Sequence, residues 1–153
     1  MVAKEFCGFF RDTPTRYQWT GTALIEYPGW AADKLAADKS LMRDAIKGKE
    51  ATKNSRKIEH PDITGAFFEP STKIQRTLDR YDDLVNAAPL PINGGCLDDI
   101  DENPVPMTIG KLKKLRNAIV DREDANYLVR KNHIKAMKLL ADPLTYDYSG
   151  GWA

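Results

Sequence analysis

The sequence predicts a mainly α fold, in which a small helical body carries a short N-terminal β-hairpin or extended arm, an extended Pro/Gly connector and a long C-terminal helix. Three observations predict this fold. Residues 31–46 and 74–85 carry apolar side chains at helical spacing. Residues 88–107 hold six prolines and glycines, which suit neither a helix nor a central strand. Residues 111–141 contain no glycine or proline and are rich in charged side chains.

These features divide the chain into three parts. Residues 1–87 form an N-terminal body made of the aromatic arm or hairpin plus two helices. Residues 88–107 form an extended acidic connector, and residues 108–153 form the long C-terminal helix with an aromatic tail. The length of 153 residues suits one domain, or one small domain with arms.

The first 27 residues are aromatic and show no helical period. Phe6, Phe9 and Phe10 cluster, and Tyr17 alternates with Trp19 before the turn-forming Thr20-Gly21-Thr22. This pattern predicts a hairpin, or two extended segments laid on a partner. A lone two-stranded hairpin is marginally stable in water, so we expect it to pack on helices or on another chain.

Local signals place the next elements along the body. A first helix is expected after Pro28-Gly29 and a stop at Gly48, because glycine is common just past a helix end. Residues 49–57 are expected to be an exposed loop or a frayed helix end. Residues 60–62 read as a turn, and the apolar patch at 63–68 as a strand or an anchor. Ser71 is expected to cap the second helix.

The connector is expected to run as an extended arm, because twenty irregular residues inside a compact domain would be unusual. Thr108 can cap the last helix, and Asp142-Pro143 ends it. Two alternatives remain for this helix. It is either one continuous rod or a helical hairpin with a break near residues 121–124. We favour the rod because no glycine or proline forces a break.

The residue types used in catalysis and metal binding do not form a recognisable constellation. Asp99, Asp101 and Asn103 match the start of a calcium loop, but Pro104 and Gly110 replace its required glycine and glutamate. His60 and His133 stand alone, and Cys7 and Cys96 are expected to be free thiols. We therefore expect no catalytic residue, no cofactor and no metal, and a protein that is not an enzyme.

Charge and hydropathy bear on the partner. Cations are frequent at 111–138, but Asp121, Glu123 and Asp124 interrupt them and the formal net charge is only +1. A nucleic-acid-binding surface usually shows a strong basic excess, so we do not expect nucleic acid as a partner. No stretch approaches the roughly 20 apolar residues of a membrane span, and the N-terminus lacks the apolar run of a signal peptide. We expect a soluble protein made in a cytoplasm.

The aromatic tail at 146–152 is the best interaction candidate, because aromatic side chains offer large contact areas at low entropic cost. The alternative is a tail folded on its own body. The predicted partner-binding residues, at both ends of the chain, are Phe6, Phe9, Phe10, Tyr17, Trp19, Tyr146, Tyr148 and Trp152.

The last third of the chain resembles a known class of proteins. Its helix carries Arg122, Tyr127 and the run Lys131-x-His133-Ile134, and the chain closes with Tyr146-Asp147 and Gly151-Trp152. This pattern is similar to the C-terminal segment of small bacteriophage tail-associated structural proteins. The resemblance implies a structural or assembly role in a virion and brings no catalytic residues with it.

The combined expectation is a non-enzymatic structural or assembly subunit of a larger particle. The particle would be a bacteriophage tail, neck or baseplate, in which the chain docks by extended arms. The partners would be other protein subunits of the virion, with a homo-oligomer within it. The location would be the virion, assembled in the host cytoplasm, and otherwise the cytoplasm. The alternatives are an accessory subunit of a cellular multiprotein complex and a small nucleic-acid-binding or inhibitor protein.

Overall fold

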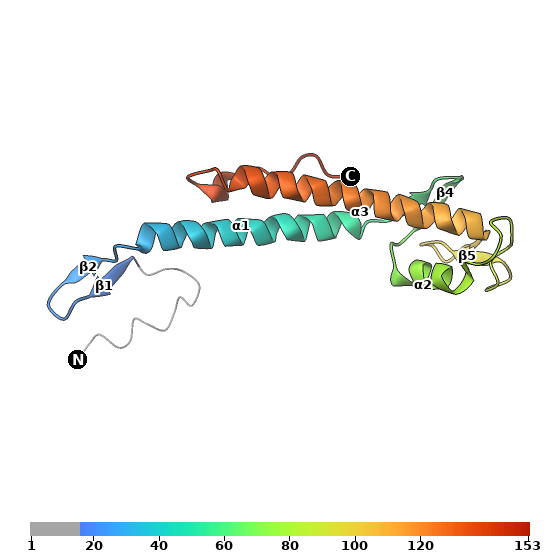
Figure 1. Cartoon of the computed structure of the whole chain (residues 1–153), viewed down its shortest axis with the longest axis horizontal. Helices are drawn as coiled ribbons and strands as arrows, with labels where there is room; N and C mark the ends of the chain where they lie inside the picture. The colour runs from blue at the N-terminus through green and yellow to red at the C-terminus, as the bar shows by residue number, and fades with distance from the viewer. Residues whose placement is uncertain (1–15) are drawn as a thin grey trace. The chain divides into compact units, whose positions relative to one another are not determined.

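A computed structural model of the chain describes residues 16–153, so Phe6, Phe9, Phe10 and Cys7 lie outside the described residues. The chain divides into two compact units. Unit 1 is Met1–Gly48 with Lys131–Gly150, and unit 2 is Lys49–Arg130 with Gly151–Ala153. In chain order the elements are β1 (Tyr17–Trp19), β2 (Leu24–Glu26), α1 (Trp30–Asn54), β3 (Ile58–His60), β4 (Ile63–Phe68), α2 (Thr72–Tyr81), β5 (Cys96–Asp98), β6 (Pro104–Pro106), α3 (Ile109–Met137) and the 3-10 turn η1 (Pro143–Thr145), as Figure 1 traces.

The predicted fold class is wrong. Between residues 16 and 153 the chain holds three α-helices and three two-stranded antiparallel sheets, so the fold mixes α and β structure and is not mainly α with one N-terminal hairpin. The hairpin at β1–β2 is present, and β4 confirms the strand alternative at 63–68, but the pairing of β4 with β3 and the sheet β5–β6 were not expected. The strands in these segments are short, so no long alternation of apolar and polar residues predicted them.

Sheet β3–β4 forms around the predicted turn at 60–62. Ile58 pairs with Phe68, and the pairing shifts at His60, which lies opposite Ile63. The His60 side chain is buried, and its Nδ1 accepts the backbone N–H of Asp62 at 3.0 Å. Its Nε2 therefore carries the ring proton and donates to the carbonyl of Lys111 at 3.0 Å. His60 thus ties this hairpin to the first turns of α3.

The predicted extended connector is also wrong, because residues 88–107 are part of a folded core. Leu90, Leu97 and Met107 are buried. The N–H of Leu90 donates to the carbonyl of Met107 at 2.9 Å, and the N–H of Met107 donates to that of Gly95 at 2.8 Å. In the two-stranded sheet β5–β6 both strands are edges, where proline is tolerated. The prolines that argued against regular structure therefore do not prevent it.

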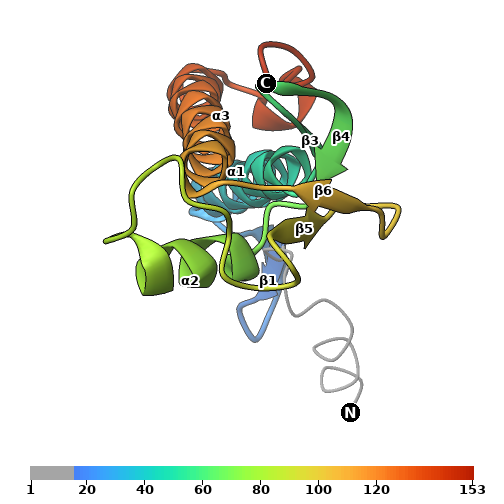
Figure 2. The same ribbon diagram turned by 90° about the vertical axis from the view of Figure 1, so that its right-hand side faces the viewer.

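The hydrophobic core of unit 2 gathers side chains from two helices and the strands. Figure 2 shows the ribbons of α2, α3, β5 and β6 that contribute to this unit. Leu112, Leu115 and Ile119 follow one face of α3 at spacings of three and four residues. Ile74 and Leu78 face this stripe from α2. The buried members of the cluster are Ala66, Phe68, Ile74, Leu78, Leu90, Leu97, Val105, Met107, Ile109, Leu112, Leu115 and Ile119.

Helix α1 runs past the predicted stop. Gly48 lies inside the helix, which continues to Asn54, so the predicted end at Gly48 is wrong. Long-range contacts within unit 2 stabilise the extra turns. Arg130 Nη1 lies 2.7 Å from Glu50 Oε2, and Asn126 Nδ2 donates to Asn54 Oδ1 at 2.6 Å. Tertiary contacts override the local preference of glycine for a helix end.

Helix α3 is continuous from Ile109 to Met137, so the alternative of a break near residues 121–124 is wrong. Thr108 acts at its start as predicted, because its Oγ1 accepts the N–H of Lys111 at 3.2 Å. The helix ends before Ala141, the expected last residue, and Asp142-Pro143 opens the turn η1 instead.

Candidate interaction site

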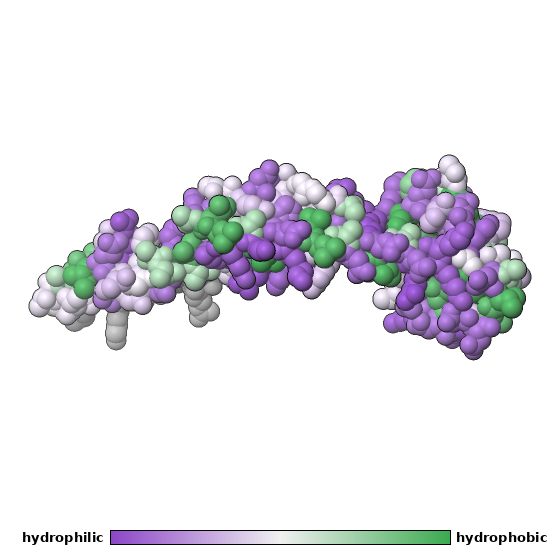
Figure 3. All heavy atoms as spheres, turned by 45° about the horizontal axis from the view of Figure 1, so that its top comes forward, coloured by the Kyte–Doolittle hydropathy of each residue, from purple (hydrophilic) through white to green (hydrophobic). Residues whose placement is uncertain are grey.

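Hairpin β1–β2 in unit 1 exposes every one of its residues. Tyr17, Trp19 and Leu24 keep 50%, 59% and 65% of their surface accessible. Tyr17 lies opposite Glu26 and Trp19 opposite Leu24. Because alternate residues of a strand share a face, these four side chains lie on one face of the hairpin. Hydrophobic atoms are visible on this hairpin at the left of Figure 3.

The turn of this hairpin is built from local hydrogen bonds. Thr20 N–H donates to the carbonyl of Ala23 at 3.0 Å, and Thr20 Oγ1 accepts the N–H of Ala23 at 3.2 Å. Gly21 has a φ of +96°, a conformation that other residues rarely adopt. The turn therefore sets the strand register without help from a core.

Arg16 holds the base of the hairpin. Its Nε lies 3.1 Å from Glu26 Oε1, and its guanidinium lies 5.5 Å from the Tyr17 ring and 5.0 Å from the Trp30 ring. The ion pair is exposed, so it contributes little on its own. The cation–π contact to Trp30 links the hairpin to the first turn of α1. The apolar face around Trp19 stays uncovered within the described chain.

The aromatic tail, by contrast, packs partly on its own helix. Tyr146 donates its hydroxyl proton to His133 Nδ1 at 2.8 Å, and His133 Nε2 donates to the carbonyl of Gly150 at 3.0 Å. The His133 and Tyr146 rings lie edge to face with centroids 5.6 Å apart. Tyr146, Tyr148 and Trp152 are half-buried. Partner binding by these three residues stays a prediction.

Asp147 shapes the turn between these aromatic residues. Its Oδ1 accepts the N–H of Ser149 at 2.9 Å. The pKa of Asp147 is lowered, first by this backbone hydrogen bond and then by the side chain of Ser149, because both favour the carboxylate. The carboxylate form of Asp147 therefore favours the turn at residues 147–149.

The sequence did not predict a polar network that lies in unit 2. The fully buried Asn126 accepts the N–H of Ala153 at 2.8 Å through its Oδ1, while its Nδ2 binds Asn54. Arg122 Nη2 donates to the carbonyl of Asn54 at 2.8 Å. Together with the Glu50–Arg130 pair, these contacts join α1 to α3 within this unit. The signal in the sequence was the interruption of the apolar face of α3 by Arg130.

The residues considered for chemistry have structural contacts. Asp99 Oδ1 accepts the N–H groups of Asp101 and Asn103, both at 2.9 Å, so its carboxylate organises the β5–β6 loop. Cys96 is a partly buried free thiol in β5. Across residues 16–153, no three His, Cys, Asp or Glu side chains are grouped so that they could hold a metal ion.

Two further findings concern membrane-spanning helices and similarity to known proteins. None of the helices in the described range is both long and apolar enough to cross a membrane. Comparison with family models, curated proteins and solved structures found no match to this chain.

Proposed function

We propose that this chain is a non-enzymatic structural or assembly subunit of a larger particle, and that it docks on a neighbouring subunit through hairpin β1–β2. The resemblance of the last third to phage tail-associated proteins favours a bacteriophage tail, neck or baseplate. The chain would then act in the virion, with other virion proteins and further copies of itself as partners.

The exposed hairpin is the single observation that carries the proposal. Both strands and the turn are exposed, and the uncovered face presents Tyr17, Trp19 and Leu24. Tyrosine and tryptophan are the residues most enriched in interface hot spots. An isolated two-stranded hairpin is marginal in water. Covering this face with a partner would stabilise the hairpin and remove its apolar surface from solvent.

The proposed docking mechanism uses fewer segments of the chain than the one that the sequence predicted. The connector belongs to the core of unit 2, so it does not act as an arm. Tyr146 is engaged with His133, which leaves the hairpin as the main docking element. Among residues 16–153 no further strand pairs with this hairpin, so both of its edges also offer backbone groups to a partner strand.

The test is incorporation of a hairpin variant into particles. A tagged chain with Tyr17→Ser and Trp19→Ser is produced in its source, and the lysate is separated by sedimentation. We expect the wild-type chain to sediment with a large particle and the variant to stay in the slow fractions. Leu41→Ser with Leu139→Ser is the matched control, because both leucines are exposed and lie outside the hairpin.

The protein composition of the particle distinguishes a virion from a cellular complex. Mass spectrometry and electron microscopy of the fast fraction should show virion proteins and tail structures. A fast fraction made only of cellular subunits contradicts the phage assignment. Sedimentation of the wild-type chain as a monomer, in a source that expresses all its natural partners, contradicts the structural role.

A further inference from the structure

The cations on the two helices α2 and α3 in unit 2 fall into two groups that the sequence alone did not separate. Most of those on α3 have a partner within the fold. Lys113 Nζ lies 2.9 Å from Asp82 Oδ1, Lys114 Nζ lies 2.7 Å from Asp62 Oδ2, and Arg116 Nε donates to Gln75 Oε1 at 2.9 Å. Helix α3 therefore has few cations to offer to a ligand, although the sequence pointed to it.

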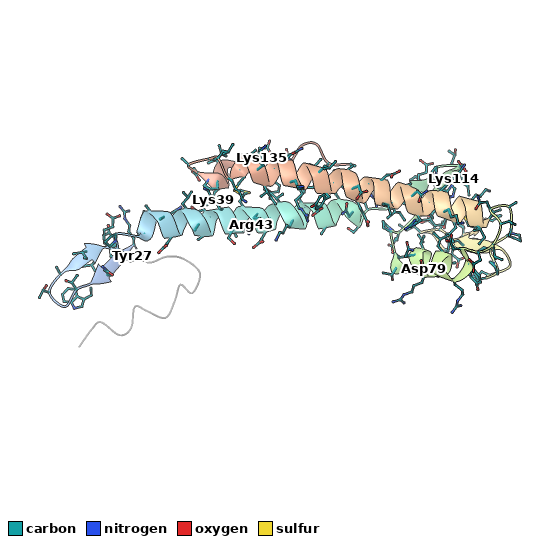
Figure 4. The ribbon with its side chains drawn as sticks, viewed as in Figure 1. Tyr27, Lys39, Arg43, Asp79, Lys114 and Lys135 are labelled. Atoms are coloured by element: carbon teal, nitrogen blue, oxygen red, sulfur yellow. The ribbon has the colours of Figure 1, made fainter. Side chains whose placement is uncertain are left out.

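The second group lies on α2. Lys73, Arg76 and Arg80 occur at spacings of three and four residues, so they follow one side of the helix. All three are exposed, and none forms an ion pair in the part of the chain that the structure describes. The only carboxylate of α2, Asp79, accepts a hydrogen bond from Gln75 Nε2 at 2.6 Å. Asp79 is labelled on α2 in Figure 4.

These cations border an open pocket of about 260 Å³. The remaining lining comes from the hydroxyl-bearing Thr72, Thr77 and Tyr81, and from Ile92 of the connector. No lining residue is acidic. Lys73 also borders a neighbouring hollow lined by four acidic residues, Glu69, Asp98, Asp99 and Glu102, so Arg76 and Arg80 contribute most of the positive charge in the α2 pocket.

This lining matches the chemistry of phosphate. Arginine presents a planar fork of donors that fits phosphate oxygens, and threonine and tyrosine hydroxyls are common further donors. Lys73 and Arg80 are separated by a rise of roughly 10 Å along the helix, which suits several phosphate groups better than one. We propose that the α2 pocket binds phosphate groups, supplied by a nucleic-acid strand or by a small phosphate compound.

The experiment compares three probes with the purified full chain at low salt. Fluorescence anisotropy follows a labelled 12-nucleotide oligothymidine, and titration calorimetry follows inorganic pyrophosphate and a 12-residue oligoglutamate. We expect the oligonucleotide or pyrophosphate to bind and oligoglutamate to bind at least tenfold more weakly. Oligonucleotide binding in the absence of pyrophosphate binding identifies a strand, and the reverse identifies a small compound.

The variant Arg76→Gln with Arg80→Gln tests the site. We expect at least a tenfold loss of affinity for the bound probe. For the oligonucleotide, the dependence of log affinity on log salt should flatten by about 1.4, the value for two lost phosphate contacts on a single strand. Lys39→Gln with Arg43→Gln is the matched control, because these two cations also lie four residues apart on a helix, α1 (Figure 4).

Several outcomes overturn the proposal. They are no binding of either phosphate probe, equal binding of oligoglutamate, or equal loss in the control variant. Amide chemical-shift mapping of the wild-type chain provides a second measurement that needs no variant. Shifts should centre on Thr72–Tyr81 and Ile92, and shifts confined to other segments contradict the site. The Tyr17→Ser, Trp19→Ser chain should bind normally, so this test is independent of the hairpin.

Discussion

The two units of the chain differ in how much apolar surface they bury. Unit 2 holds a cluster of twelve buried hydrophobic residues drawn from α2, α3 and the strands. The buried hydrophobic residues of unit 1 are Met42, Ile46, Met137 and Pro143 among those described, while Trp19 and Leu24 of the hairpin are more than half exposed. Burial of apolar area is the main favourable term in folding. Unit 2 therefore has the means to fold by itself, whereas the hairpin needs a further surface.

The largest expected effect is in the core of unit 2. Leu115 is fully buried in the cluster, so Leu115→Ala should lower the free energy of unfolding by about 2–5 kcal/mol, from lost transfer energy plus a cavity. Leu139→Ala, at a leucine that is 82% exposed, should change it by less than about 0.5 kcal/mol. Urea unfolding followed by circular dichroism measures both. Equal effects would remove the distinction between the units.

The next effect concerns the ion pair that joins α1 to α3 inside unit 2. The side chains of Glu50 and Arg130 are only 12% and 26% exposed. Glu50→Gln should cost about 2 kcal/mol, less than a fully buried pair because Arg130 keeps some contact with solvent. The exposed Asp44–Lys47 pair is the control, and Asp44→Asn should cost less than about 0.5 kcal/mol. A similar cost in the two variants would show that burial does not strengthen the Glu50–Arg130 pair.

Alanine substitutions at two helical glycines should change the stability of the protein in opposite directions. A Cβ on Gly48 would meet nothing, so Gly48→Ala should stabilise the protein by about 0.5–1 kcal/mol through helix propensity. A Cβ on Gly110 would lie 3.1 Å from Asn86, in the tightly packed start of α3, so Gly110→Ala should destabilise it by roughly 1 kcal/mol. Thermal unfolding of both variants checks the signs. If the Gly110→Ala variant were more stable than wild type, Asn86 would have to move away from the added Cβ at little energetic cost.

The smallest effect is a dependence on pH in the β5–β6 loop. The N–H of Asn103, followed by its side chain and the N–H of Asp101, lowers the pKa of Asp99 below 3.8. Because the folded pKa is the lower one, Asp99 stabilises the fold above about pH 4, and the contribution is lost as pH falls through the folded pKa. Asp99→Asn should therefore be less stable than wild type at pH 6, with the gap narrowing at pH 3. Urea midpoints at both values measure the gap, and a gap that widens at pH 3 contradicts this role.

The sequence predicted those elements that have strong local signals. The Thr108 cap and the uninterrupted α3 followed from capping chemistry and from the absence of glycine and proline. The turn at 60–62 and the N-terminal hairpin followed from turn residues beside short apolar runs.

What the sequence did not predict depends on contacts between distant residues. Helix α1 passes Gly48 because Glu50 and Asn54 find partners 72 to 80 residues away. The connector is folded because Leu90, Leu97 and Met107 reach a core formed by α2 and α3. The sequence does not distinguish the cations of α2 from those of α3. They differ in their ion-pair partners, which the structure shows for α3.

Hydrogen exchange of the isolated chain tests the central claim most directly, at a dilution where light scattering shows a monomer. The amides of Tyr17–Trp19 and Leu24–Glu26 should exchange nearly as fast as those of an unfolded chain, while those of Leu112–Ile119 should exchange only through global unfolding. In the assembled particle the hairpin amides should become protected. Hairpin amides as slow as those of α3 in the monomer would contradict the account, because the hairpin would then need no partner.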